Sequence, residues 1–132
     1  MLKFVVYGIP RPQGSKRGFY RNGRVVLVEA SKQLPEWRGA VIESAKLAAL
    51  ESGWVTCDSA CRVEVTFFLP KPKTVKRQFP IVPPDADKLL RAVFDSLTAA
   101  KVVSDDSVIC DVIVLKRYAD SPGAVVTVMP LL

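Results

Sequence analysis

The chain has 132 residues, of which 49% are hydrophobic and 24% charged, so it is predicted to form one packed domain over residues 1–132, and a disordered chain is excluded. Nineteen basic against thirteen acidic residues give a net charge of +6, which indicates either a polyanionic partner such as nucleic acid or merely good solubility. The absence of histidine excludes His-based catalysis and His-ligated metal sites.

The N-terminal half is predicted to contain a strand, a hairpin and a helix. β-Branched and aromatic residues predict the first strand at 3–7, and a basic loop rich in proline and glycine follows at 11–17. Asn22-Gly23 lies between two strand-like runs, which is typical of a β-hairpin. Apolar residues at steps of three and four predict an amphipathic helix over residues 32–51.

The C-terminal half is predicted to contain three strands and a second helix. Alternating apolar and polar residues predict a strand at 62–69, and a basic loop with five prolines follows at 70–84. Asp85 opens an amphipathic helix, and two further strands are expected at 108–117 and 124–129.

Three cysteines, Cys57, Cys61 and Cys110, are expected to be buried and reduced, because their number is odd and no second pair of zinc ligands accompanies them. The apolar run at residues 4–9 is too short for a signal-peptide core, and no stretch approaches the length of a membrane span. We therefore expect a cytoplasmic protein with no membrane contact.

Charge is sorted along the chain. Residues 1–40 contain eight basic and two acidic residues, and the loop at 70–84 contains four basic residues and no acidic one. Residues 85–120 contain seven aspartates against five basic residues. Basic loops beside a carboxylate cluster are typical of a metal-dependent phosphodiesterase, because cations hold the phosphate backbone and carboxylates hold magnesium.

Each acidic residue also has a purely structural interpretation. Asp85 and Asp87 can converge on one ion if the backbone is extended there, but Asp85 is also a typical helix N-cap. Asp105 and Asp106 are typical turn residues. Arg91 lies four residues after Asp87, where an exposed ion pair within the helix is an equally ordinary role.

Two segments resemble a known family. Residues 84–98, PDADKLLRAVFDSLT, followed by DDSVI at 105–109, resemble the signature of RusA-type Holliday-junction resolvases, which are common in bacteriophages and prophages. The Asp-x-Asp, the helix ending in Phe-Asp-x-Leu-Thr and the downstream Asp-Asp match in order and spacing over about 25 residues. Residues 8–17 resemble the first-strand loop of the family more weakly.

The resemblance implies a RusA-like α+β fold: a single small domain with a mixed β-sheet and two main helices. It also implies a homodimeric endonuclease that uses Mg²⁺ or Mn²⁺ to cut four-way DNA junctions by paired symmetric nicks. By position, Asp85, Asp87 and Asp106 would be the metal-binding carboxylates. The family's essential lysine falls on Arg91 and its asparagine on Lys88, so either cation could fill the lysine's role.

The mechanism expected on this basis is metal-assisted hydrolysis, in which the ion lowers the pKa of a bound water and the resulting hydroxide attacks phosphorus in line. Arg91 or Lys88 would neutralise charge developing on the phosphoryl oxygens. Six cations are expected to contact DNA phosphates, although each could instead belong to a merely solvated loop: Lys16, Arg17, Lys71, Lys73, Lys76 and Arg77.

Two other functions stay open at this stage. The first is a DNA-junction-binding or regulatory protein of the same fold that does not cut DNA. The second is a small interaction domain of a phage particle or complex, whose basic residues only make it soluble. A homodimer is expected because two symmetric incisions require two carboxylate clusters. Residues 108–115 are apolar on both faces apart from Asp111, which offers surface for a dimer unless a monomer's sheet buries it.

Overall fold

The computed structural model describes residues 1–14, 17–28 and 33–132, and for 17–21 and 24–28 it describes the backbone alone. Its centre is a four-stranded sheet in the order β1-β6-β4-β5. The first three strands are antiparallel neighbours, whereas β4 and β5 are parallel, so the sheet is mixed. The strands are β1 (Leu2–Tyr7), β4 (Cys61–Leu69), β5 (Ile109–Tyr118) and β6 (Gly123–Pro130).

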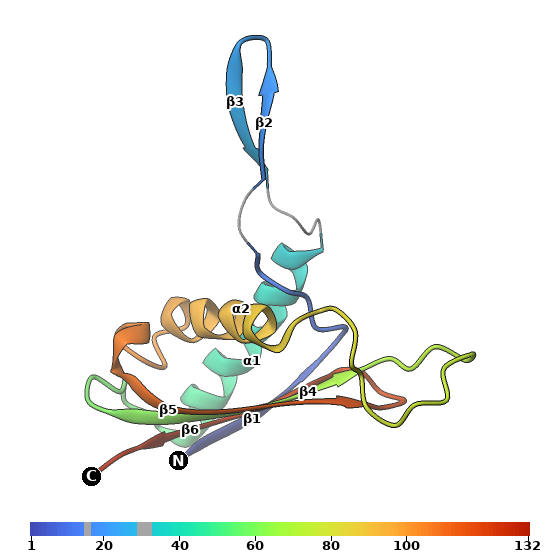
Figure 1. Ribbon diagram of the computed structural model, residues 1–132. Helices are drawn as coiled ribbons and strands as arrows, with labels where there is room; N and C mark the ends of the chain where they lie inside the picture. Colours follow the sequence, from blue (N-terminus) through green and yellow to red (C-terminus); the bar gives the residue numbers. More distant parts are fainter. Residues whose placement is uncertain (15–16, 29–32) are drawn as a thin grey trace.

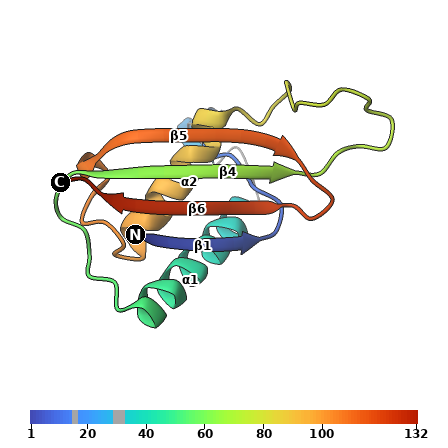
Figure 2. The same cartoon turned by 90° about the horizontal axis from the view of Figure 1, so that it is seen from below.

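Two helices, α1 (Leu34–Ser52) and α2 (Ala86–Ala99), lie on the same face of this sheet (Figures 1 and 2). A short 3₁₀ helix, η1 (Asp106–Val108), connects the end of α2 to β5. The predicted α+β architecture, with a mixed sheet and two main helices, is therefore confirmed. No helix in the described part of the chain is long and apolar enough to cross a membrane.

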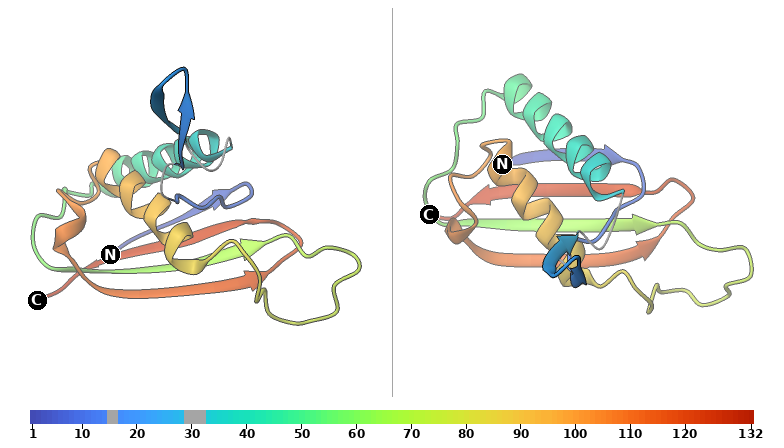
Figure 3. Two further views of the ribbon diagram at one scale, coloured as in Figure 1. Left: turned by 45° about the horizontal axis from the view of Figure 1, so that its top comes forward. Right: turned by 90° about the horizontal axis from the view of Figure 1, so that it is seen from above.

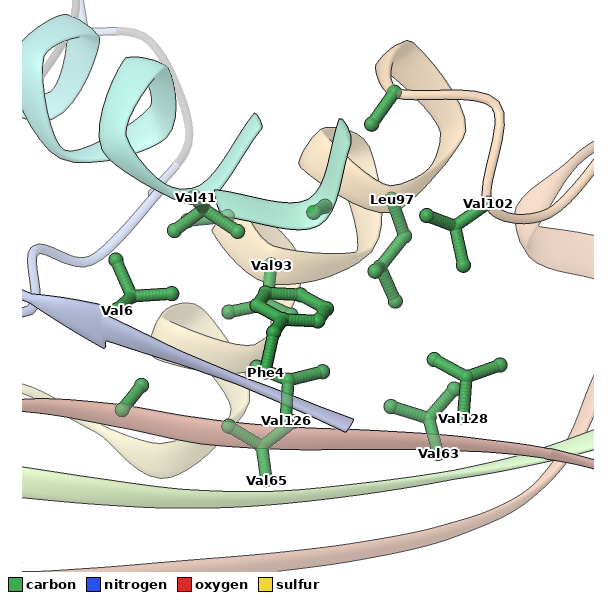
Figure 4. Close-up of a cluster of buried hydrophobic side chains, with 14 of the residues drawn as sticks. Phe4, Val6, Val41, Val63, Val65, Val93, Leu97, Val102, Val126 and Val128 are labelled. Carbon is green, nitrogen blue, oxygen red and sulfur yellow. The ribbon is translucent and has the colours of Figure 1, made fainter. Parts of the chain in front are cut away.

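The core lies between the sheet and the helices (Figure 4). Its residues follow the two-residue period of the strands and the three-to-four-residue period of the helices. Alternate residues of β1, β4 and β6 point toward the helices because side chains on a strand alternate between its faces. The helices contribute residues spaced three and four apart. Buried side chains from these elements include Phe4, Val6, Trp37, Val41, Val63, Val65, Phe67, Val93, Leu97, Val126 and Val128.

The predicted hairpin is confirmed as β2 (Arg17–Arg21) and β3 (Arg24–Val28), which form a separate two-stranded sheet. Asn22 and Gly23 have positive φ angles of 52° and 74°, as a two-residue hairpin turn requires. The hairpin extends away from the central sheet and the helices (Figures 1 and 3).

Helix boundaries follow the expected signals closely. Gly53, with φ 68°, ends α1, and its N–H donates to the carbonyls of Ala49 and Leu50. The predicted start of this helix at residue 32 lies outside the described residues. The loop at 70–84 contains no helix or strand, as expected.

Gly123 packs too closely against β1 to accept a side chain. A Cβ atom there would lie 2.2 Å from the backbone oxygen of Val6. Gly123→Ala should therefore lower the free energy of unfolding by about 1–3 kcal/mol, measured by urea denaturation. Gly39→Ala is the matched control, because its Cβ would have no neighbour within 4 Å, and alanine favours the helix by up to about 1 kcal/mol. Equal effects at the two glycines would contradict this prediction.

The cysteines differ in exposure. Cys57 and Cys61 are buried as expected, but Cys110 is exposed, so the expectation for that residue was wrong. The reason is that β5 forms an edge of the sheet and only part of it is covered.

Cys61 should resist alkylation in the folded protein. Burial, and secondarily the neighbouring Cys57, raise the pKa of its thiol from 9.0 to about 11. At pH 8 this lowers the reactive thiolate fraction by about a hundredfold, in addition to the steric protection. Mass spectrometry after iodoacetamide treatment should find Cys61 unmodified without urea and modified in urea. Rapid modification of Cys61 under native conditions would contradict this expectation.

Candidate active site

The start of α2 presents a carboxylate that does not cap its helix. Asp85 occupies the N-cap position with extended backbone angles, but its side chain makes no capping hydrogen bond. Its Oδ2 instead lies 3.4 Å from the Nζ of Lys88, and both side chains are about half exposed. Asp85 therefore occupies the N-cap position without capping the helix through its side chain. Its carboxylate is available to a partner other than the N–H groups of the helix.

Asp87 lies in the first turn of α2 and is exposed. Among the described residues, no basic side chain forms a salt bridge with Asp87, so the alternative of an Asp87–Arg91 ion pair is not observed. Arg91 is also exposed, one helical turn further along. Two accessible carboxylates and an accessible guanidinium thus lie within the first two turns of one helix.

Asp106 is located elsewhere. It begins η1, is half-buried, and its Oδ1 accepts a hydrogen bond of 2.5 Å from the hydroxyl of Thr98 in the last turn of α2. Among the residues that the structure describes, no three carboxylates or thiols are close enough to hold one metal ion. The structure therefore brings Asp85, Asp87, Lys88 and Arg91 together and places Asp106 at the opposite end of the helix.

Asp105 has the ordinary turn role that was considered for both aspartates. It is the N-cap of η1, and its carboxylate accepts a 3.0 Å hydrogen bond from the backbone N–H of Ser107. Hydrogen bonds from the side chain and then the backbone of Ser107 lower the pKa of Asp105 below its usual value. Asp105 and Asp106 are adjacent in sequence but therefore have different environments.

Gln13 was not singled out from the sequence, yet it ties the N-terminal loop to α2. Its backbone N–H donates to the carbonyl of Lys88 at 2.9 Å, and its Nε2 donates to the carboxylate of Asp95. Its Oε1 is buried and has no hydrogen-bond partner among the described residues. Gln13 therefore holds the loop that contains Arg11 against the polar side of the helix.

The basic loop contains two kinds of cation. Lys71 and Arg77 lie over the ring of Tyr118, at 5.7 and 5.9 Å from its centre, which is typical of cation–π contacts. Lys73 and Lys76 are exposed, and neither forms a salt bridge with any described residue. Lys73 and Lys76 are therefore the loop cations most available to phosphate.

The same loop encloses a groove that leads to the start of α2. This groove has a volume of about 710 Å³ and is lined by residues 9–12, by Tyr118 and by several prolines, including Pro84, which precedes Asp85. Two further predicted DNA contacts cannot be placed: Lys16 lies outside the described residues, and Arg17 is described by its backbone alone.

Comparison with known proteins agrees with this arrangement of motifs. The sequence profile of the family described as "Endodeoxyribonuclease RusA" matches residues 9–129, which include the start of α2, the basic loop and η1. The chain is also 30% identical over 135 aligned residues to the "Uncharacterized protein YqaN" of Bacillus subtilis (strain 168), covering 92% of this chain and 90% of that protein. With a profile match over nearly its whole length, the chain belongs to the RusA endodeoxyribonuclease family.

Proposed function

We propose that this protein is a homodimeric, Mg²⁺- or Mn²⁺-dependent endodeoxyribonuclease that resolves four-way (Holliday) DNA junctions by paired symmetric nicks in the bacterial cytoplasm. The observation that supports this most directly is the exposed pair Asp85 and Asp87 at the start of α2, in a chain of the RusA family. The carboxylate of Asp85 makes no capping hydrogen bond to the helix. The basic loop at 70–84 ends beside this pair and supplies a surface for the DNA backbone.

The donor chemistry fits a hard divalent cation. Carboxylate oxygens are the ligands that Mg²⁺ prefers, and Asp85 and Asp87 are accessible to solvent. Asp85 and Asp87, which lie together at the start of α2, are the residues that would hold the ion; Asp106 is the third ligand that the resemblance implies, and within one chain it lies at the opposite end of the helix. When bound, such an ion would supply a Lewis acid and lower the pKa of a water molecule for attack on phosphorus.

The two helix cations have different surroundings. Lys88 already lies 3.4 Å from Asp85, so part of its charge is used to offset that carboxylate. Arg91 has no acidic partner among the described residues and is exposed on the same helix. We therefore assign the neutralisation of charge on the scissile phosphate to Arg91, while Lys88 orients Asp85.

A cleavage assay on a synthetic four-way junction tests this function. We expect nicks at symmetric positions in two opposing strands with Mg²⁺ or Mn²⁺, none with EDTA, and little cleavage of duplex or single-stranded controls. Salt-sensitive junction binding without nicking under any metal condition would favour the non-catalytic junction-binding protein. The absence of any salt-sensitive DNA binding would favour an interaction domain.

A further inference from the structure

The groove beside the start of α2 has the size and the lining of a ligand site. Its volume of about 710 Å³ falls within the range of pockets that enclose a ligand as large as a nucleotide. Prolines and aliphatic side chains form most of its lining. Arg11 and Arg77 are its only charged residues in the described part of the chain, and neither forms a salt bridge there. The groove therefore combines an apolar surface with two positive charges that no described carboxylate offsets.

Both walls of the groove are fixed next to the candidate active site. The segment after β1 is held by the backbone N–H of Gln13, which donates to the carbonyl of Lys88 at 2.9 Å. The proline-rich segment before Asp85 is held by the Nζ of Lys116, which donates to the carbonyl of Val82 at 3.0 Å. Figures 1 and 3 show both segments at the end of the sheet that lies next to the start of α2. A ligand in the groove is therefore close to the proposed metal ligands.

Two polar atoms of residues that line the groove lack a partner within the protein. The Nε of Arg77 and the hydroxyl of Tyr118 are buried, and neither has a hydrogen-bond partner among the described residues. The guanidinium of Arg77 lies over the ring of Tyr118, 5.9 Å from its centre. Buried polar groups are normally satisfied, so a ligand with hydrogen-bonding groups along its edge would remove an existing cost.

From these features we propose that the groove receives one unpaired nucleotide of the strand being cut, next to the scissile phosphate. The inference rests on the proposed function, because it concerns the DNA at the same site. A phosphate alone requires positive charge but no apolar lining. A nucleobase has a flat apolar face and a polar edge, and guanidinium groups such as that of Arg11 stack on bases as well as pairing with phosphates. The groove matches each of these parts.

Such a groove makes the enzyme selective for branched DNA. Taking a base out of its stack costs free energy, and the cost is lowest where the base is already unpaired or poorly stacked. The branch point of a junction offers such bases, whereas the interior of a continuous duplex does not. Carboxylates and a metal ion act on any phosphodiester, so in this arrangement the groove determines which one is presented to them.

Binding of two single-stranded hexamers tests the site without any cleavage. One is a thymidine hexamer, and the other has the same phosphates but no bases. Fluorescence anisotropy in EDTA should show that the wild type binds the thymidine hexamer roughly tenfold more tightly, because one stacked base is lost in the other. Val82→Trp and Ile9→Trp should bind both hexamers equally, since each fills the groove from one wall without changing its charge.

Val55→Trp is the matched control for these two variants. Val55 is an exposed valine in the loop after α1, and it does not line the groove. Val82 and Ile9 are each 42% exposed, so tryptophan should be tolerated at both positions, which circular dichroism verifies. Equal binding of the two hexamers by the wild type would overturn the inference. An undiminished preference in either filled variant, provided that it is folded, would also overturn it, and if one variant does not fold the other decides.

Arg11→Lys tests whether the guanidinium stacks on the base. Lysine keeps the charge but has no planar group, so the preference for the thymidine hexamer should fall while the slope of log affinity against log salt stays the same. Arg11→Gln should lower both. A full preference in Arg11→Lys would mean that Arg11 contacts phosphate only, and the stacking role assigned to it would be wrong.

Junctions that lack one base connect the groove to cleavage. Once the nicks are mapped, an abasic nucleotide placed on one side of the cut should slow cleavage by the wild type roughly tenfold, whereas Val82→Trp should cut the normal and abasic junctions equally. Equal cutting of both junctions by the wild type would overturn the placement beside the scissile phosphate. If the wild type prefers the thymidine hexamer but cuts no junction, the proposed function fails and the groove remains a nucleotide site.

Discussion

Asp85→Asn, Asp87→Asn and Asp106→Asn should each lower the rate of metal-dependent junction nicking by roughly a hundredfold or more while leaving junction binding close to that of the wild type. Asparagine keeps the shape of aspartate, but its neutral amide is a far weaker ligand for a hard dication. The measurements are single-turnover cleavage of a labelled four-way junction and gel-shift binding in Ca²⁺ or EDTA.

Asp105→Asn is the matched control for Asp106→Asn. It removes the same charge at the neighbouring position, but its carboxylate only receives hydrogen bonds from Ser107, a role that an amide oxygen can retain. Nicking by Asp105→Asn should therefore remain within about tenfold of the wild type. If any two of Asp85→Asn, Asp87→Asn and Asp106→Asn cut the junction at the wild-type rate, the proposed assignment of the metal ligands is wrong.

The second large effect is expected in the basic loop. Lys73→Ala with Lys76→Ala should weaken junction binding and reduce the slope of log affinity against log salt by up to about two units, because each phosphate contact releases close to one counterion. Thermal stability should stay the same, because both side chains are exposed and form no salt bridge with a described residue. Changing Arg77 as well should add a further loss of binding.

Arg77→Ala alone should behave differently from the lysine pair. Its guanidinium covers the ring of Tyr118, so its removal should lower the melting temperature as well as the affinity. Lys3→Ala with Lys46→Ala is the charge-matched control, since these exposed lysines lie on β1 and α1, away from the loop. A double variant of Lys73 and Lys76 with an unchanged salt slope would show that the loop faces away from DNA.

The fold was predictable where the signals are local. The alternation in β4, the three-and-four spacing in α1 and the Asn22-Gly23 turn each depend on neighbours within a few residues, and the structure confirms all three. The exposure of Cys110 was not predictable in this way. It depends on β5 being an edge strand, and strand order is set by the packing of the whole chain.

In the candidate site, too, the features that depend on neighbours in sequence were predictable, and those that depend on distant parts of the chain were not. Asp85, Asp87 and Arg91 lie within seven residues, so their proximity follows from the helix alone. The contact of Gln13 with α2 could not be predicted from the sequence, because its partner Asp95 is 82 residues away along the chain. The distance between Asp106 and Asp87 depends on the helix α2 that lies between them. The family motif gives only the order and spacing of these aspartates along the chain, so it does not show that distance.

The parallel pairing of β4 and β5 makes the separation of the carboxylates a topological property. Two parallel strands need a connection that returns from the end of the first to the beginning of the second, and here the loop at 70–84, α2 and η1 form this crossover. Asp85 and Asp87 stand at its entrance into the helix and Asp106 at its exit. Because α2 itself spans this separation, rearranging the loop alone cannot close the distance between these two groups in a single chain.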